Sequence, residues 1–366
     1  MSRNILAIVL GVAVMLLWPV AAYTDGPQAN NVVGAVYTMT NAAEGNEVVY
    51  FDRDSKGILT NARSISTEGY GSGGGLDELA SQGSVVLSED HRWLLVANAG
   101  SNEISVFQVR PGGLSLVDKT DSEGVFPVSL TIFHDLVYVL NAKGSPNISG
   151  FYLSHTGQLI HLDNSIRSLG SGAFSQVKFS PTGVWLVVTD RGDSEILVYG
   201  VGKSGLPSID PVTSSSSGAG PFGAIFDRRG HLLVVEAGSN AVSSYNISST
   251  GALQVISSSV ANGQSASCWI TGNQRGDIFT ANTGNQNISA YQLMAGSGEI
   301  SLLDETAGAG NRPIDMAVTV DGRFLYALDP ADGAIDMFQI KPNGSLIDLG
   351  KAGAGLDIFA QGTAAR

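Results

Sequence analysis

The sequence predicts an all-β fold, a seven-bladed β-propeller whose carboxyl terminus supplies the inner strand of the first blade. Three observations predict this fold. One strand pattern recurs seven times, its copies lie about 48 residues apart, and the last strand matches the strand that the first copy lacks. Repeats of this length, with about four short strands each, are typical of propeller blades.

The amino terminus predicts a secretory signal peptide. Arg3 precedes an apolar run from Ile5 to Trp18, and small residues follow up to Ala22. The run is too short for a membrane span of about 20 residues, although an uncleaved anchor is the alternative. We therefore expect a signal peptide over 1–22, an extension over 23–33 and one propeller domain over 34–366. The mature protein would be secreted, and periplasmic or at the cell surface in a bacterium.

Composition restricts the partners. The formal net charge of -13 argues against a nucleic acid or an anionic membrane as partner. Cys268 is the only cysteine, so no internal disulfide can form. We expect a monomer that binds a small molecule, with no organic cofactor.

The repeats are aligned by a polar residue that ends the second strand of each blade. The steps between these residues are 57, 43, 49, 46, 46 and 47. A glycine-rich insertion that begins near Gly69 explains the long first step, and we expect it to form a mobile flap over the ligand face. The seven aligned residues are Asn41, Asn98, Asn141, Asp190, Glu236, Asn282 and Asp329.

The closure of the ring follows from the two chain ends. The first copy begins at Gly34 without a preceding inner strand, whereas AQGTAA, residues 360–365, matches SQGSVV, residues 81–86, at the start of the second blade. The carboxyl-terminal strand therefore completes blade one and removes a free sheet edge.

Two segments resemble the YVTN-type repeats of the lactonase-like propeller family: ANAGSNEISVF in blade two and FSPTGVWLVVTDRGDSEILVYGV in blade four. The resemblance covers residues 34–365. That family includes 6-phosphogluconolactonases and 3-carboxy-cis,cis-muconate lactonising enzymes. The resemblance implies action on a lactone or an unsaturated carboxylic acid, by lactone hydrolysis or by a muconate cyclase-like ring closure.

The expected ligand site lies on the face where inner strands start and second strands end, around the channel mouth. There the resemblance implies a P-R-H-x-x-F pattern and a nearby glutamate. The matching segment, residues 221–226, has Phe222 and Gly223 in place of the arginine and the histidine. All five histidines fall in turns of the opposite face or near outer strands, so the catalytic residues must differ from those of the family.

Candidate site residues are those that depart from the repeat at this face, since residues common to every blade are explained by blade geometry. Glu236 is a candidate general base, and Lys178 with Arg191 are candidate anchors for an anionic substrate. The candidate ligand-binding residues are Gln176, Asp190, Trp269 and Asp315. The seven aligned polar residues are interpreted mainly as turn caps. Their oxygens could alternatively hold a calcium ion at the channel mouth.

Two functions of different class stay open. The first is an enzyme for lactones or unsaturated acids with rearranged catalytic residues. The second is a non-catalytic extracellular propeller that binds a small molecule, glycan or protein. Convergence of Glu236, Lys178 and Arg191 in one pocket would favour the enzyme, and an exposed aromatic patch around Trp269 would favour the binding protein.

Overall fold

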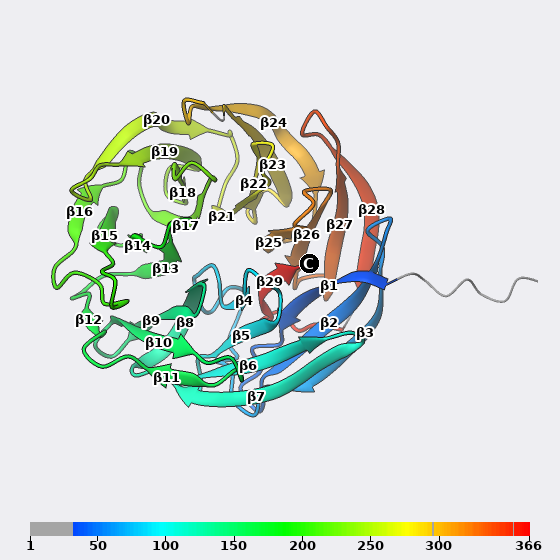
Figure 1. The fold of residues 1–366 in the computed structure, drawn as a ribbon. Coiled ribbons are helices and arrows are strands. Elements are labelled where there is room, and N and C mark those ends of the chain that lie inside the picture. The colour runs from blue at the N-terminus through cyan, green and yellow to red at the C-terminus, as the bar shows by residue number, and fades with distance from the viewer. Residues whose placement is uncertain (1–31, 295, 354) are drawn as a thin grey trace, which may run out of the picture. The chain divides into compact units, whose positions relative to one another are not determined.

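The computed structural model describes residues 32–294, 296–353 and 355–366, where every regular element is a β-strand. These strands form seven antiparallel sheets arranged in a ring (Figure 1), which confirms the predicted seven-bladed propeller. The predicted signal peptide, residues 1–22, lies outside the described residues. The first strand begins at Val32, two residues before the predicted boundary at Gly34. Among the described residues, no helix is long and apolar enough to cross a membrane.

The strands of each blade follow one another from the centre of the ring outward. Blade one contains β29 (Gln361–Ala365), β1 (Val32–Met39), β2 (Glu47–Asp54) and β3 (Leu59–Ser66). Blade two contains β4 (Val85–Leu87), β5 (Trp93–Asn98), β6 (Glu103–Arg110) and β7 (Gly113–Asp121). Blade three contains β8 (Val125–Phe133), β9 (Leu136–Lys143), β10 (Asn147–Leu153) and an outer strand in two pieces, β11 (Leu159–His161) and β12 (Arg167–Ser168). Blade four contains β13 (Phe174–Phe179), β14 (Trp185–Asp190), β15 (Glu195–Gly200) and β16 (Val212–Ser215).

The remaining blades have the same order. Blade five contains β17 (Pro221–Phe226), β18 (Leu232–Glu236), β19 (Ala241–Ile247) and β20 (Leu253–Ala261). Blade six contains β21 (Ser267–Gly272), β22 (Asp277–Asn282), β23 (Asn287–Leu293) and β24 (Ile300–Ala309). Blade seven contains β25 (Ile314–Val318), β26 (Phe324–Asp329), β27 (Ala334–Ile340) and β28 (Leu346–Gly353).

The predicted closure is confirmed. Strand β29 pairs antiparallel with β1, with Ala364 opposite Tyr37 and Gln361 opposite Met39. In Figure 1 the red β29 lies beside the blue β1 on the inner side of the ring. The Thr38 hydroxyl also donates to the Gln361 carbonyl oxygen at 3.1 Å, so the last strand is tied to blade one by its backbone and by a side chain.

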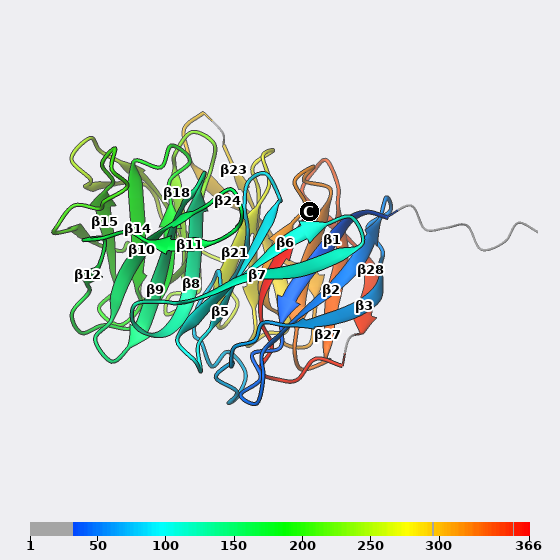
Figure 2. The same cartoon turned by 60° about the horizontal axis from the view of Figure 1, so that its bottom comes forward.

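The core lies between neighbouring blades, because most second and third strands are buried on both faces. A tyrosine contact repeats at two of these interfaces. The Tyr138 hydroxyl of β9 donates to Gly205 of blade four at 2.8 Å, and the Tyr326 hydroxyl of β26 donates to Gly57 of blade one at 2.9 Å. Figure 2 shows β28 of blade seven next to β3 of blade one, where the ring closes. The interface between blades seven and one therefore has the same tyrosine contact as the interface between blades three and four.

Candidate functional site

The ring has two faces with different connections. We call the face where the inner strands begin the start face, and the face where they end, with the turns to the second strands, the end face. Arg191 and the other residues that follow the second strands lie on the start face, whereas His91, His134 and His231 lie in turns of the end face. The predicted positions of these three histidines are confirmed.

At the start face, a short segment crosses the central channel. Residues 81–83, predicted to begin the inner strand of blade two, precede β4 and instead bond to three other blades. We call this segment the cross-brace. The Gln82 amide donates to the Ile270 carbonyl oxygen at 2.8 Å and accepts from the Ile270 N–H at 3.0 Å, which joins blade two to blade six. Further bonds connect Ser81 to Val128 of blade three and to the Trp269 indole N–H of blade six, and Gln82 to Ser175 of blade four.

The cross-brace explains the glycine at position 223. A Cβ atom at Gly223 would lie 2.2 Å from Oε1 of Gln82 and 3.0 Å from the carbonyl oxygen of Cys268. The side chain of Gln82 thus fills the space that a side chain from blade five would need. Trp269 is only 2% exposed, and its ring packs edge-on against Phe222 at 5.4 Å between ring centroids. This position therefore offers no exposed aromatic patch for a ligand.

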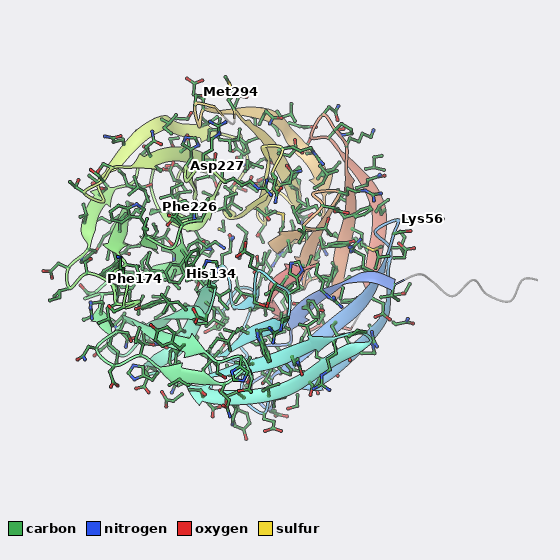
Figure 3. The ribbon with its side chains drawn as sticks, in the orientation of Figure 1. Lys56, His134, Phe174, Phe226, Asp227 and Met294 are labelled. Atoms are coloured by element: carbon green, nitrogen blue, oxygen red, sulfur yellow. The ribbon has the colours of Figure 1, made fainter. Side chains whose placement is uncertain are left out.

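Two cavities open on the end face of the ring, whereas the sequence analysis expects the ligand site on the start face. The cross-brace and Trp269 occupy the axis near the start face. The larger cavity, which we call the channel cavity, has a volume of about 700 Å³ and is lined by the ends of six inner strands and the turns after them. Figure 3 shows Phe226 from the end of β17, which lines it, on the inner side of the ring.

Lys178 is the candidate residue that this cavity contains. Burial lowers the pKa of its ammonium group, and the nearby Asp315 carboxyl group partly offsets this effect. Within the described residues its side chain makes no hydrogen bond or ion pair. Arg228 and Arg229 also line the cavity, and their guanidinium groups likewise have no partner among the described residues. The channel cavity therefore presents three uncommitted cations.

Other inward-facing side chains bond to the next blade. Gln176 accepts a hydrogen bond from the Ala224 N–H, and Asp315 accepts from the Thr363 N–H at 3.1 Å and from the Met316 N–H at 2.8 Å. Ser129 plays the same part for the Val177 N–H at 3.2 Å. Burial raises the pKa of the Asp315 carboxyl group to about 7, against the opposing effect of its backbone donors. These contacts give Gln176 and Asp315 a role in joining blades.

The seven aligned polar residues are buried, and the contacts of five of them support the turn-cap interpretation. Each of the five bonds to the connection that leads into its own blade, as Asp190 does by accepting from the Ala173 N–H at 3.0 Å. Asn98 bonds to Asn46 of blade one and to Ser105 of β6. Asn41 in blade one instead bonds to Ser72 in the insertion. Apart from Oδ1 of Asn141, which is buried without a partner among the described residues, these residues use their side-chain oxygens as hydrogen-bond acceptors, so they offer too few free oxygens for a calcium cage. The described residues hold no group of three or more histidine, cysteine, aspartate or glutamate side chains arranged for a metal ion.

Glu236 is fully buried within such a network. Its Oε1 accepts from the Ser216 hydroxyl at 2.8 Å, the Gly218 N–H at 2.7 Å and the Ser243 hydroxyl at 2.8 Å. Its Oε2 accepts from the Ser259 hydroxyl at 2.8 Å. Lys178 lines the channel cavity, and Arg191 is exposed in the turn after β14, so the structure does not bring the three catalytic candidates together.

We expect Glu236→Gln to lower stability by about 1–2 kcal/mol, because the amide keeps one acceptor but places NH₂ where Oε2 accepts from Ser259. Ligand binding in the channel cavity should persist. Thermal unfolding together with ligand titration of the same variant checks both parts. Abolished binding or turnover in a variant of unchanged melting temperature would instead assign Glu236 a catalytic role.

Blade seven has a buried carboxylate cluster near the start face. Asp329 and Asp336 both approach Lys351, at 3.6 and 3.1 Å, and Asp332 also pairs with this lysine. Burial raises the pKa of Asp336 to about 7, and the Asp329 charge adds to this shift while Lys351 opposes it. Ionised Asp336 is therefore a destabilising group.

The contribution of Asp336 to the stability of the protein should fall as pH rises from about 4 to about 7. In this range folded Asp336 holds a proton that the unfolded chain, with an ordinary pKa of 3.8, releases. Each unit of difference in pKa corresponds to about 1.4 kcal/mol. Asp336→Asn cannot ionise, so we expect its melting temperature to exceed that of the wild type at pH 8 and to match it near pH 4. Parallel melting curves for the two proteins across this range would reject the assignment.

Comparison with known proteins identifies the family. A model of the family "Lactonase, 7-bladed beta-propeller" matches residues 35–175 and 173–355. The chain belongs to this lactonase family. The 6-phosphogluconolactonase of Bacillus subtilis is 22% identical over 260 residues, which cover 66% of this chain and 74% of that protein.

Solved structures share the fold of this lactonase-family propeller. A putative 6-phosphogluconolactonase from Bacteroides fragilis has a TM-score of 0.71 at 17% identity and covers 92% of this chain and 99% of its own. The periplasmic gluconolactonase of Pseudomonas aeruginosa has a TM-score of 0.69 at 17% identity, with coverage of 89% and 98%. A functionally unknown protein from Desulfotomaculum acetoxidans has a TM-score of 0.69 at 10% identity, with coverage of 90% and 98%.

Sequence reasoning missed both the cross-brace and the end-face cavity of this lactonase-family chain. Gln82 aligned with an ordinary strand start, so nothing local marked it as crossing the channel. One signal was present: Gly223 is the only glycine among the third positions of the inner strands, which indicates that another group fills its space. Arg228 and Arg229 form the only Arg-Arg pair in the chain, but an exposed turn explains such a pair equally well.

Proposed function

We propose that this lactonase-family propeller binds a small organic anion in the channel cavity. The anion is either a lactone that the protein hydrolyses or an unsaturated acid that it cyclises to a lactone. The observation that carries the proposal is Lys178, a half-buried cation in a cavity of about 700 Å³, without a partner among the described residues. A carboxylate or phosphate on the ligand would supply the missing counter-charge.

The charge of the cavity supports this choice. The chain has 33 acidic and 20 basic residues, yet Lys178, Arg228 and Arg229 gather at one cavity. Two carboxylates also line the cavity. Asp227 is engaged by His231 at 2.7 Å and by two backbone N–H groups, which leaves, among the described residues, three cations against the single free carboxylate of Glu89. An acidic protein that concentrates uncommitted cations in a concave site favours an anionic ligand.

The names of the relatives indicate the chemical class. The Bacillus subtilis protein is named for a phosphorylated gluconolactone, and the Pseudomonas aeruginosa protein for a gluconolactone. We infer a sugar-acid lactone of this kind as substrate. Non-catalytic binding is the second candidate, and the presence of Phe222 and Gly223 where the family pattern has arginine and histidine favours it.

Replacement of Lys178 tests the proposal. Lys178→Met keeps the length of the side chain and removes its charge, so we expect the affinity for gluconate and 6-phosphogluconate to fall at least tenfold in isothermal titration calorimetry. Lys56→Met is the control, because Lys56 is exposed on the outer rim of the ring, as Figure 3 shows. Unchanged affinity in Lys178→Met would overturn the proposed site.

A pH-stat assay with the corresponding lactones separates the two candidate functions. Proton release above the rate of spontaneous hydrolysis, lost in Lys178→Met, supports the enzyme. Binding of the acids without any acceleration supports the non-catalytic binding protein.

We also propose that the protein is exported. The signal-peptide pattern of residues 1–22 supports export, and a periplasmic gluconolactonase among the proteins of similar fold is consistent with it. The intact mass of the exported protein should correspond to a chain that begins at Tyr23. A mature chain that retains Arg3 would contradict this.

A further inference from the structure

A second cavity opens on the end face, between blades two and three. Its volume is about 560 Å³, and it is formed by the turns after β4, β8 and β10. We call it the lateral groove. Its lining includes Glu89, His134, Asp135, Ser154 and His155.

The lateral groove adjoins the channel cavity. Glu89 lines both of them. Phe133 lines the channel cavity and the next residue, His134, lines the groove, with their ring centroids 4.2 Å apart. Figure 3 shows His134 towards the centre of the ring. One ligand can therefore extend from the channel into the groove.

The two cavities have complementary chemistry. The channel cavity holds Lys178, Arg228 and Arg229. The groove lining holds mainly carboxylate and imidazole groups, and its cation Arg92 is paired with Asp90 at 3.8 Å. The side chains of Glu89, Asp135, His134 and His155 make no hydrogen bond or ion pair within the part of the chain that the structure describes. Carboxylates accept hydrogen bonds from hydroxyl groups, and imidazoles can accept or donate them. An anionic end therefore suits the channel, and a tail rich in hydroxyl groups suits the groove.

We infer that the ligand is a sugar acid, or its lactone, that carries a further sugar, with the acid end on Lys178 and the second sugar in the lateral groove. This inference rests on the proposed function and specifies its substrate class. Pockets of 300–1,000 Å³ accommodate drug-sized ligands, so a single six-carbon acid occupies only part of the two adjoining cavities. The exposed ring of His134 offers a flat surface for the sugar ring.

Two acids that differ by one sugar test the inference on the full chain. Gluconate carries the acid alone, and lactobionate carries the same acid with a galactosyl group. We expect lactobionate to bind at least tenfold more tightly in isothermal titration calorimetry. The groove variants Asp135→Ala and His155→Ala should reduce this preference towards onefold and leave gluconate affinity unchanged. Asp210→Ala, at an exposed position outside both linings, is the matched control and should keep the preference.

The possible results separate the inference from the proposed function. Equal affinity for the two acids, or a preference for lactobionate that both groove variants retain, would reject the inference that one ligand occupies both cavities. The proposed anion site at Lys178 would be unaffected by this result. Gluconate affinity that Lys178→Met does not change overturns the proposed site itself. Binding of neither acid overturns both.

Discussion

Deletion of residues 360–366 is expected to abolish cooperative folding or to lower the free energy of unfolding by several kcal/mol. The deletion removes β29, which supplies the inner strand of blade one and is buried over Gln361–Ala364. It exposes the inner edge of β1 and removes the Thr363 N–H that bonds to Asp315 of blade seven. Loss of a buried strand from a closed ring combines cavity formation with unpaired backbone groups, each among the most destabilising kinds of change.

Denaturant unfolding and size-exclusion chromatography of the truncated chain check this expectation. Arg366→Ala is the control, because it removes only a side chain that bonds to the Tyr37 hydroxyl at 3.0 Å. We expect the control to stay within about 1 kcal/mol of the wild type. A truncated chain with the unfolding midpoint of the wild type would show that the ring does not depend on β29 for closure.

Gln82→Ala is expected to destabilise the protein by about 2–5 kcal/mol. The substitution leaves both the N–H and the carbonyl oxygen of Ile270 without a partner, and each buried unsatisfied group costs about 1–3 kcal/mol. It also leaves a cavity on the channel axis. Gln254→Ala, at an exposed position on β20, should change the stability by less than about 0.5 kcal/mol.

A double-mutant cycle tests the proposed fit between Gln82 and Gly223. Gly223→Ala alone should be destabilising, because its Cβ atom would meet Oε1 of Gln82. In a Gln82→Ala background the same substitution should cost much less, since that oxygen is absent. Additive effects of the two substitutions would show that the side chains do not share this space.

The repeat pattern was sufficient to predict the fold, because each copy contains the strand and turn residues that determine the geometry of its own blade. Strand ends, polar turn residues and the matching QG segments are all visible within about 50 residues of sequence. The contacts of residues 81–83 with other blades could not be predicted in this way. Gln82 bonds to Ile270, 188 positions away, and only the closed ring brings these two residues together.

For the candidate site too, the sequence showed which residues depart from the repeat but not which residues they contact in the folded ring. Glu236 departs from its column, but its carboxylate is saturated by hydroxyl groups from the connection before β17 and from β19 and β20. Lys178 was selected from the same kind of departure, and it does line a cavity. Sequence alone did not show that this cavity opens on the end face, because the crossing of the channel by residues 81–83 was hidden.

A crystal structure of the protein soaked with lactobionate tests the central claim most directly. The claim is that the ligand site has its entrance on the end face and its anionic anchor at Lys178. We predict ligand density in the channel cavity, with the carboxylate within hydrogen-bonding distance of the Lys178 ammonium group and the galactosyl group towards His134. Ligand density on the start face, beside Arg191 or Glu236 and with the channel cavity free of ligand, would contradict it.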